Sequence, residues 1–143
     1  MTTKEAENQI TEQTFVEKLT DAVKNLTYPS ESDEKIKVID WQADNPAPFD
    51  VLLLKKYLGL TPKMALYQAK WEEFFERVLK IEDWFAEEDK QKVERFQQVK
   101  DLIINNLEHI QYFRAGHSEV EAYVIGKDID GKWKGLKTLI IET

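Results

Sequence analysis

The hairpin near the end of the chain is the feature that most limits its fold. Asp128-Ile129-Asp130-Gly131 has the Asp and Gly content of a tight turn, and it lies between two runs rich in β-branched and aromatic residues. These runs, 119–126 and 132–141, are predicted to be strands of one antiparallel hairpin. The second run stays apolar through Ile141, so we expect it to hold the end of the chain in a sheet, with Thr143 just outside it.

The rest of the chain contains both helical and strand patterns. Two further strands are predicted, at 36–41 and 112–114. Apolar residues at helical spacing predict helices at 12–25, 50–58, 62–79 and 87–107. The order of one helix, one strand, several helices and then three strands predicts an α+β fold. In its natural closure, helices cover both faces of a mainly antiparallel central sheet.

Composition limits the classes of partner. The chain has 143 residues, enough for a single domain with a real core, and it has no cysteine, which excludes disulfides. Its net charge of −7 argues against direct binding to nucleic acid, because phosphate contacts need a basic surface. An acidic protein suits a basic protein partner. We find no apolar run long enough to span a membrane, and expect a cytoplasmic protein that is a monomer when free.

The sequence gives little support to catalysis. The two histidines, His109 near a predicted helix end and His117 in a predicted turn, have no further ligands at the spacing of a metal site. The chain also has no glycine-rich phosphate loop and no nucleophile-elbow pattern. Carboxylates are plentiful, but an acid–base enzyme would need a convergent pair of them in a closed pocket. We therefore expect no enzyme activity and no cofactor.

Three residues each allow a structural and a functional interpretation. Trp84 lies among acidic residues between two predicted helices, where it could fill the core or stand exposed as an interface anchor. Glu31 lies in a Ser-Glu-Ser-Asp loop, where a carboxylate is often only solvated or caps nearby amides. Thr143 could merely end a strand, or its hydroxyl and carboxylate could be held in place to ligate a hard cation such as Mg²⁺.

Several short segments, in this order and spacing, resemble the nuclease A inhibitor family. They are Tyr-Pro-Ser-Glu-Ser-Asp at 28–33, Glu-Asp-Trp-Phe at 82–85, Glu-Ala-Tyr-Val-Ile-Gly at 121–126, and the terminal Glu142-Thr143. The similarity is greatest from residue 82 to the end and least from 42 to 80. The family consists of small acidic, cyanobacterial-type proteins that block a sugar-nonspecific DNA/RNA endonuclease of the ββα-metal class.

The resemblance implies a fold, a function and three site residues. It implies a three-layer α/β/α sandwich and a single domain of this family at 11–143. The polar character of the N-terminus separately predicts a flexible segment at 1–10. Glu31 would replace a phosphate at an arginine of the nuclease, Trp84 would meet the nuclease, and Thr143 would ligate the Mg²⁺ of the partner. The alternative is an acidic adaptor domain with the same fold that binds a different basic protein.

Overall fold

The computed structural model describes residues 13–41 and 48–142. The N-terminal segment 1–10, predicted to be flexible, and Thr143 lie outside the described residues. The helices of the described residues are α2 (Phe15–Val23), α3 (Val51–Leu58), α4 (Trp71–Leu79) and α5 (Glu87–Asn106). The strands are β1 (Thr27–Tyr28), β2 (Glu34–Asp40), β3 (Leu66–Ala69), β4 (Glu108–Ala115), β5 (Glu119–Lys127) and β6 (Trp133–Ile141).

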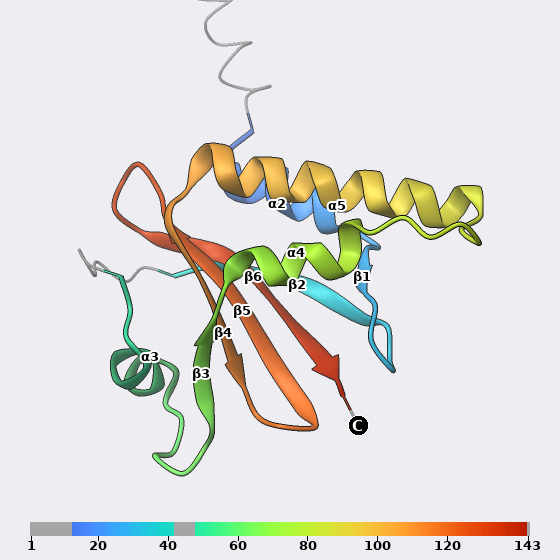
Figure 1. Cartoon of the computed structure of the whole chain (residues 1–143). Coiled ribbons are helices and arrows are strands. Elements are labelled where there is room, and N and C mark those ends of the chain that lie inside the picture. Colours follow the sequence, from blue (N-terminus) through green and yellow to red (C-terminus); the bar gives the residue numbers. More distant parts are fainter. Residues whose placement is uncertain (1–12, 42–47, 143) are drawn as a thin grey trace, which may run out of the picture.

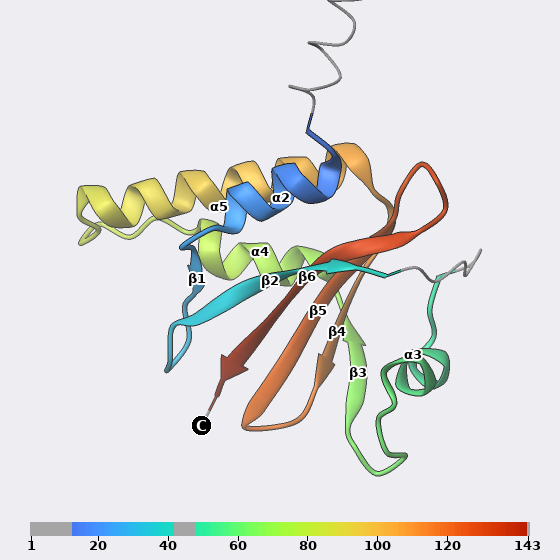
Figure 2. The same ribbon diagram turned by 180° about the vertical axis from the view of Figure 1, so that it is seen from behind.

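All six strands form one sheet in the order β1-β2-β6-β5-β4-β3, and every neighbouring pair is antiparallel. The hairpin of β5 and β6 lies at its centre, with Val124 opposite Leu136, and β6 also pairs with β2. Figures 1 and 2 show α2, α4 and α5 together on one face of the sheet, and α3 beside β3 on the other. The predicted α+β class with an antiparallel sheet is confirmed.

Alternation along the strands produces a core on each face of the sheet. On β5, Val124 faces the core under α2, α4 and α5, whereas Tyr123 and Ile125 face the core beside α3. Helix α3 covers only one end of the second face, because Lys35 and Lys37 are exposed on β2 further along it. The complete three-layer sandwich therefore stays a prediction.

Local signals explain where the helices begin and end. The side chain of Thr14 accepts a hydrogen bond from the amide of Glu17, and the carboxylate of Glu17 accepts one from the amide of Thr14. This capping box satisfies amide groups that the first turn of α2 leaves without partners. At the end of α3, Gly59 adopts a left-handed conformation with φ of 69°, which most side chains disfavour. The end of α3 at Leu58 agrees with the predicted range 50–58, whereas α2 begins at Phe15, three residues after its predicted start.

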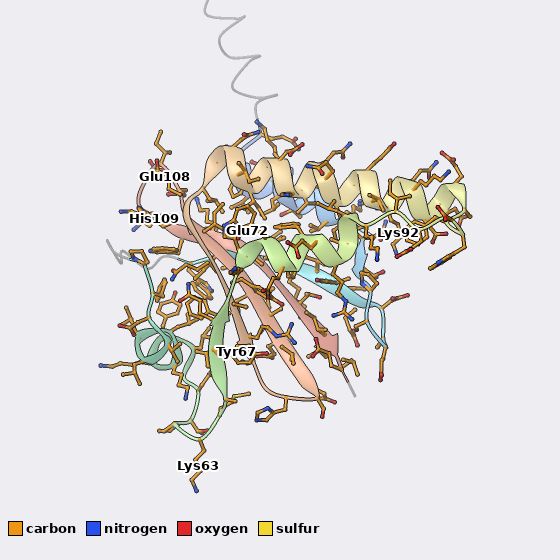
Figure 3. All side chains as sticks on the ribbon, in the orientation of Figure 1. Lys63, Tyr67, Glu72, Lys92, Glu108 and His109 are labelled. Atoms are coloured by element: carbon orange, nitrogen blue, oxygen red, sulfur yellow. The ribbon has the colours of Figure 1, made fainter. Side chains whose placement is uncertain are left out.

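The helix predicted over 62–79 is wrong in its first half. Residues Leu66–Ala69 form the edge strand β3, which pairs with β4 so that Leu66 lies opposite Ala115, and the helix begins only at Trp71. Leu66 is buried in the second core, and Tyr67 on the outer strand is exposed (Figure 3). Pairing with a long neighbouring strand overrides the weak helical pattern of this segment. His109 lies three residues beyond the end of α5, near a helix end as expected, and belongs to β4.

Candidate partner-binding site

The end of β6 meets two loops from distant parts of the chain. The amide of Ile141 donates to Ser30 Oγ over 3.1 Å, and the amide of Glu31 donates to the carbonyl of Ile141 over 3.3 Å. The amide of Glu142 donates to the carbonyl of Ser118, in the β4–β5 turn, over 2.7 Å. Figures 1 and 2 both show the end of β6 between the β1–β2 loop and this turn. The backbone at Glu31 is therefore attached to the strand that leads to the chain end.

Glu31 lies on a loop that is also held from within. Ser30 Oγ donates to the carbonyl of Ser32 over 2.6 Å, in addition to accepting from Ile141. These bonds restrain the backbone on both sides of Glu31, while its side chain is exposed. An exposed carboxylate on a restrained loop can accept hydrogen bonds from a cation of another molecule with little loss of conformational freedom.

Trp84 lies on the surface, so the core interpretation of this residue is wrong. Its side chain is 76% exposed, and its ring packs edge to face on the half-buried ring of Phe85, with 4.7 Å between centroids. The amide of Phe85 donates to the carbonyl of Glu82 over 3.1 Å, which closes a turn in this loop between α4 and α5. Trp84 thus presents a large apolar surface to solvent, as interface anchors do.

Glu31 and Trp84 line the same shallow groove. Its remaining lining residues come from the β1–β2 loop, from α4 and from the loop that follows α4: Pro29, Ser30, Arg77, Lys80, Glu82 and Phe85. The groove, called here the Glu31–Trp84 groove, has a volume of about 420 Å³. The fold therefore brings together two of the three predicted site residues, which are far apart in the sequence. The third, Thr143, lies outside the described residues, but its neighbour Glu142 is described.

Glu142 is held by two arginines that the sequence analysis did not single out. Its Oε1 atom is 2.6 Å from Nη2 of Arg114 and 3.6 Å from Nη1 of Arg77. Arg114 also donates from Nε to the hydroxyl of Tyr67 over 2.8 Å, and from Nη1 to that of Tyr112 over 2.9 Å. Burial by itself lowers the pKa of Arg114, but its hydrogen bonds to Glu142 and Tyr112 outweigh this effect and raise it.

One signal in the sequence points to this arrangement. Arg114 is a charged residue within the otherwise apolar strand segment 112–115, and a buried charge needs a partner. The sequence does not identify that partner, because Glu142 follows β6, 28 residues further along the chain.

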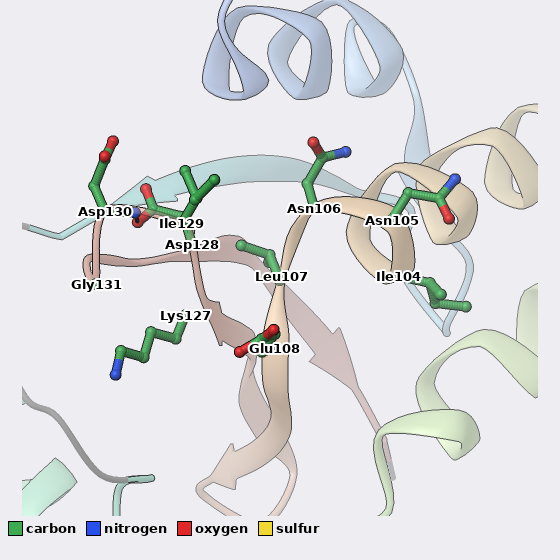
Figure 4. Close-up of a pocket in the computed structure, with 10 residues that line it drawn as sticks. All are labelled: Ile104, Asn105, Asn106, Leu107, Glu108, Lys127, Asp128, Ile129, Asp130 and Gly131. Carbon is green, nitrogen blue, oxygen red and sulfur yellow. Dashed lines mark hydrogen bonds between the residues drawn. The ribbon is translucent and has the colours of Figure 1, made fainter.

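A hollow larger than the Glu31–Trp84 groove lies elsewhere in the described part of the chain. It has a volume of about 670 Å³ and lies between the end of α5 and the β5–β6 turn. The side chains of Ile104, Lys127 and Asp130 point in different directions in Figure 4, not towards one point. Asp128 is already engaged, because it accepts from two backbone amides and pairs with Lys134 at 2.6 Å. Such a surface has no convergent groups for catalysis.

The described residues hold neither a cluster of metal ligands nor a membrane-spanning helix. Across 13–41 and 48–142, no three His, Cys, Asp or Glu side chains gather as ligands for a metal ion. Among the helices described, none has the length and apolar character needed to cross a membrane.

Comparison with protein families assigns the chain to a class. The family model described as nuclease A inhibitor-like protein matches residues 13–143, so the chain belongs to this family. A comparison with curated proteins found no match. Members of the family are inhibitors of nucleases and not enzymes, and membership implies a nuclease as partner.

Proposed function

We propose that this protein is a stoichiometric inhibitor of a sugar-nonspecific DNA/RNA endonuclease of the ββα-metal class, and that it blocks the Mg²⁺-containing active site. The observation that carries the proposal is the position of Glu31 and Trp84 in one exposed groove, beside the anchored end of β6. The net charge of −7 adds support, since a nuclease groove is basic in order to hold nucleic acid.

Glu31 supplies the phosphate mimic in this proposal. Its carboxylate takes the place of a nucleic-acid phosphate and accepts hydrogen bonds from an arginine of the nuclease. A guanidinium group binds either anion through two parallel hydrogen bonds, so the exchange of phosphate for carboxylate is chemically conservative. Ser30 Oγ accepts from the Ile141 amide and donates to the Ser32 carbonyl, and these bonds support this role, because a restrained loop loses little entropy on docking.

Thr143 supplies the metal ligand in this proposal. In a chain that ends at Thr143, the residue offers a hydroxyl and a carboxylate, which are the hard oxygen donors that Mg²⁺ prefers. In the active site of the nuclease, the metal would otherwise activate the scissile phosphate. The hydrogen bond from the Glu142 amide to Ser118 supports this role, because it anchors the residue immediately before Thr143.

Trp84 supplies the apolar anchor. With 76% of its side chain exposed, it has most of its surface available for burial against the wall of a partner's groove. Glu31 provides ionic attraction next to it, so the two residues combine a charged and an apolar contact on a single surface.

The proposal is tested by titration of a panel of nonspecific nucleases with the purified protein. DNA and RNA cleavage by a ββα-metal nuclease should both fall linearly and reach zero near a 1:1 molar ratio. A nonspecific nuclease without a ββα-metal site serves as the control and should remain active. Full activity of every ββα-metal nuclease at tenfold excess of the protein would refute the proposal. Co-purification of a basic protein other than a nuclease would then favour the acidic adaptor.

A further inference from the structure

The position of Glu142, the residue directly after β6, depends on contacts other than strand pairing. The last residue of β6, Ile141, has Glu119 as its cross-strand partner in β5. After it, the amide of Glu142 donates to the carbonyl of Ser118. Hydrogen bonds at the end of a strand open more easily than those in the middle of a sheet. The carboxylate of Glu142 adds the second point of attachment, at Arg114.

Arg114 is oriented before it meets Glu142. Three nitrogens of its side chain have three different partners: Nε donates to Tyr67, Nη1 to Tyr112 and Nη2 to Glu142. Its side chain is only 15% exposed. Ala122, directly opposite Arg114 on β5, is small enough to leave room for the arginine to reach across that strand towards the end of β6. Because the two tyrosines fix two edges of the planar guanidinium, its third edge holds Glu142 in one direction.

Arg77 connects this assembly to the Glu31–Trp84 groove. It extends from α4 to the same carboxylate oxygen of Glu142, at 3.6 Å, and its guanidinium lies over the ring of Tyr28, 5.9 Å from the centroid. Arg77 is also one of the residues that line the groove. Glu142 therefore forms an ion pair with a residue that lines the Glu31–Trp84 groove.

We propose that Arg114 is a positioning residue, which fixes the direction in which the chain leaves the sheet by holding the side chain of Glu142. The inference rests on the proposed function in one respect: the fixed direction matters because the chain end enters the active site of the nuclease. In this proposal Arg114 acts through Glu142. By holding Glu142, it lowers the entropy that this residue would otherwise lose on docking.

Amide hydrogen exchange in the free protein tests the positioning without any nuclease. Arg114→Gln should speed exchange of the Glu142 amide at least tenfold, while amides in the middle of β5 exchange as in wild type. Glu142→Gln removes the same ion pair and leaves Arg114 bonded to its two tyrosines, so it should also speed exchange at this amide. It replaces Arg114→Gln in the test if that variant folds poorly. Arg114→Lys keeps the charge but loses the planar fork, and should also speed exchange.

Lys134→Gln is the matched control for these variants. It breaks an ion pair of the same 2.6 Å length at the other end of β6, and should leave exchange at Glu142 unchanged. An equal rate at Glu142 in wild type, Arg114→Gln and Glu142→Gln would overturn the proposal. Exchange of wild-type Glu142 at the rate of an unstructured peptide would overturn it as well.

Inhibition assays then link positioning to function. Against a nuclease that wild type inhibits, Arg114→Gln should raise the inhibition constant at least tenfold, about 1.4 kcal/mol, and Lys134→Gln should not. Wild-type inhibition by Arg114→Gln, with faster exchange at Glu142, would show that the direction of the chain is irrelevant and overturn the proposal. A wild type that inhibits no nuclease refutes the proposed function instead, and the exchange rates alone then decide the positioning.

Discussion

The two ends of β6 each carry an ion pair with a 2.6 Å contact, yet the pairs do different things. At the beginning of the strand, Lys134 binds Asp128; just after its end, Glu142 binds Arg114. The first pair joins residues of the same hairpin and reinforces a turn in which Asp128 already accepts two backbone hydrogen bonds. The second pair reaches from β4 across β5 to the chain end.

The difference shows how similar contacts can have different consequences. The Asp128–Lys134 pair stabilises a local shape that the backbone already favours, so its effect stays within the hairpin. The Arg114–Glu142 pair fixes the position of a segment with few other bonds, beside exposed residues that suit a partner. Its removal should change recognition more than stability.

The largest expected effect is on the stability of the core that supports both ends of β6. Phe96 on α5 is 2% exposed, and its ring lies 6.2 Å from that of Tyr28. Phe96→Ala should lower the free energy of unfolding by about 3–5 kcal/mol, because it leaves a cavity under the helix. Denaturant melts measure this loss. A loss under about 1 kcal/mol would contradict the placement of this ring as a main support of the sheet.

The sequence predicted this core better than it predicted the site. Helix α5 and its stripe Phe96, Val99 and Ile103 follow from regular apolar spacing, which is a local property of the chain. Strand β3 did not, because Leu66–Ala69 becomes a strand only by pairing with β4, 47 residues away at the Tyr67–Arg114 pair. The contact between Arg114 and Glu142 depends on the same strand order and was equally invisible.

The next largest effects concern the Glu31–Trp84 groove. Glu31→Ala and Trp84→Ala should each weaken inhibition by about 2 kcal/mol or more, as is usual for central anchors. Both side chains are exposed, so the melting temperature should change little. Raising the salt concentration should weaken inhibition by wild type more than by Glu31→Ala, because the attraction of Glu31 is largely ionic.

Two outcomes would contradict the proposed roles of Glu31 and Trp84. Inhibition at the wild-type level by both alanine variants would remove them from the site. Loss of folding in Trp84→Ala would show instead that the ring supports the structure. The sequence allowed a structural and a functional interpretation of both residues. The exposure of Trp84 decides against a core role for that residue.

A smaller effect is expected at the turn end of β6. Asp128→Asn keeps an oxygen for the two backbone hydrogen bonds but places an amide beside Lys134, and should cost about 1 kcal/mol of stability with no effect on inhibition. Burial raises the pKa of Asp128, but its hydrogen bonds to Lys134 and the Lys132 amide outweigh this and lower it.

The pH dependence of stability follows from this lowered pKa. The carboxylate of Asp128 stabilises the fold fully above the ordinary pKa of an aspartate, about 3.9, and this contribution disappears as the pH falls through the lowered value. The gap in stability between wild type and Asp128→Asn should therefore narrow from pH 5 to pH 2. A gap that stays constant over this range would contradict the ionic role of Asp128.

No effect at all is expected from removing metal ions from the free protein. In the described residues, no three acidic or histidine side chains gather as metal ligands, and in this account the Mg²⁺ belongs to the nuclease. The melting temperature should be the same with and without EDTA in a thermal scan. A fall of several degrees with EDTA would show that the protein binds a structural metal of its own.

The most direct test of the central claim places extra residues at one chain end. The inhibition constant for a ββα-metal nuclease is compared among three proteins: untagged, with an N-terminal hexahistidine tag, and with the same tag after Thr143. The C-terminal tag adds bulk at the metal and turns the carboxylate of Thr143 into an amide. We predict that it weakens inhibition at least tenfold, about 1.4 kcal/mol, while the N-terminal tag leaves it within about twofold. Equal inhibition by all three proteins would contradict the claim that the chain end enters the active site.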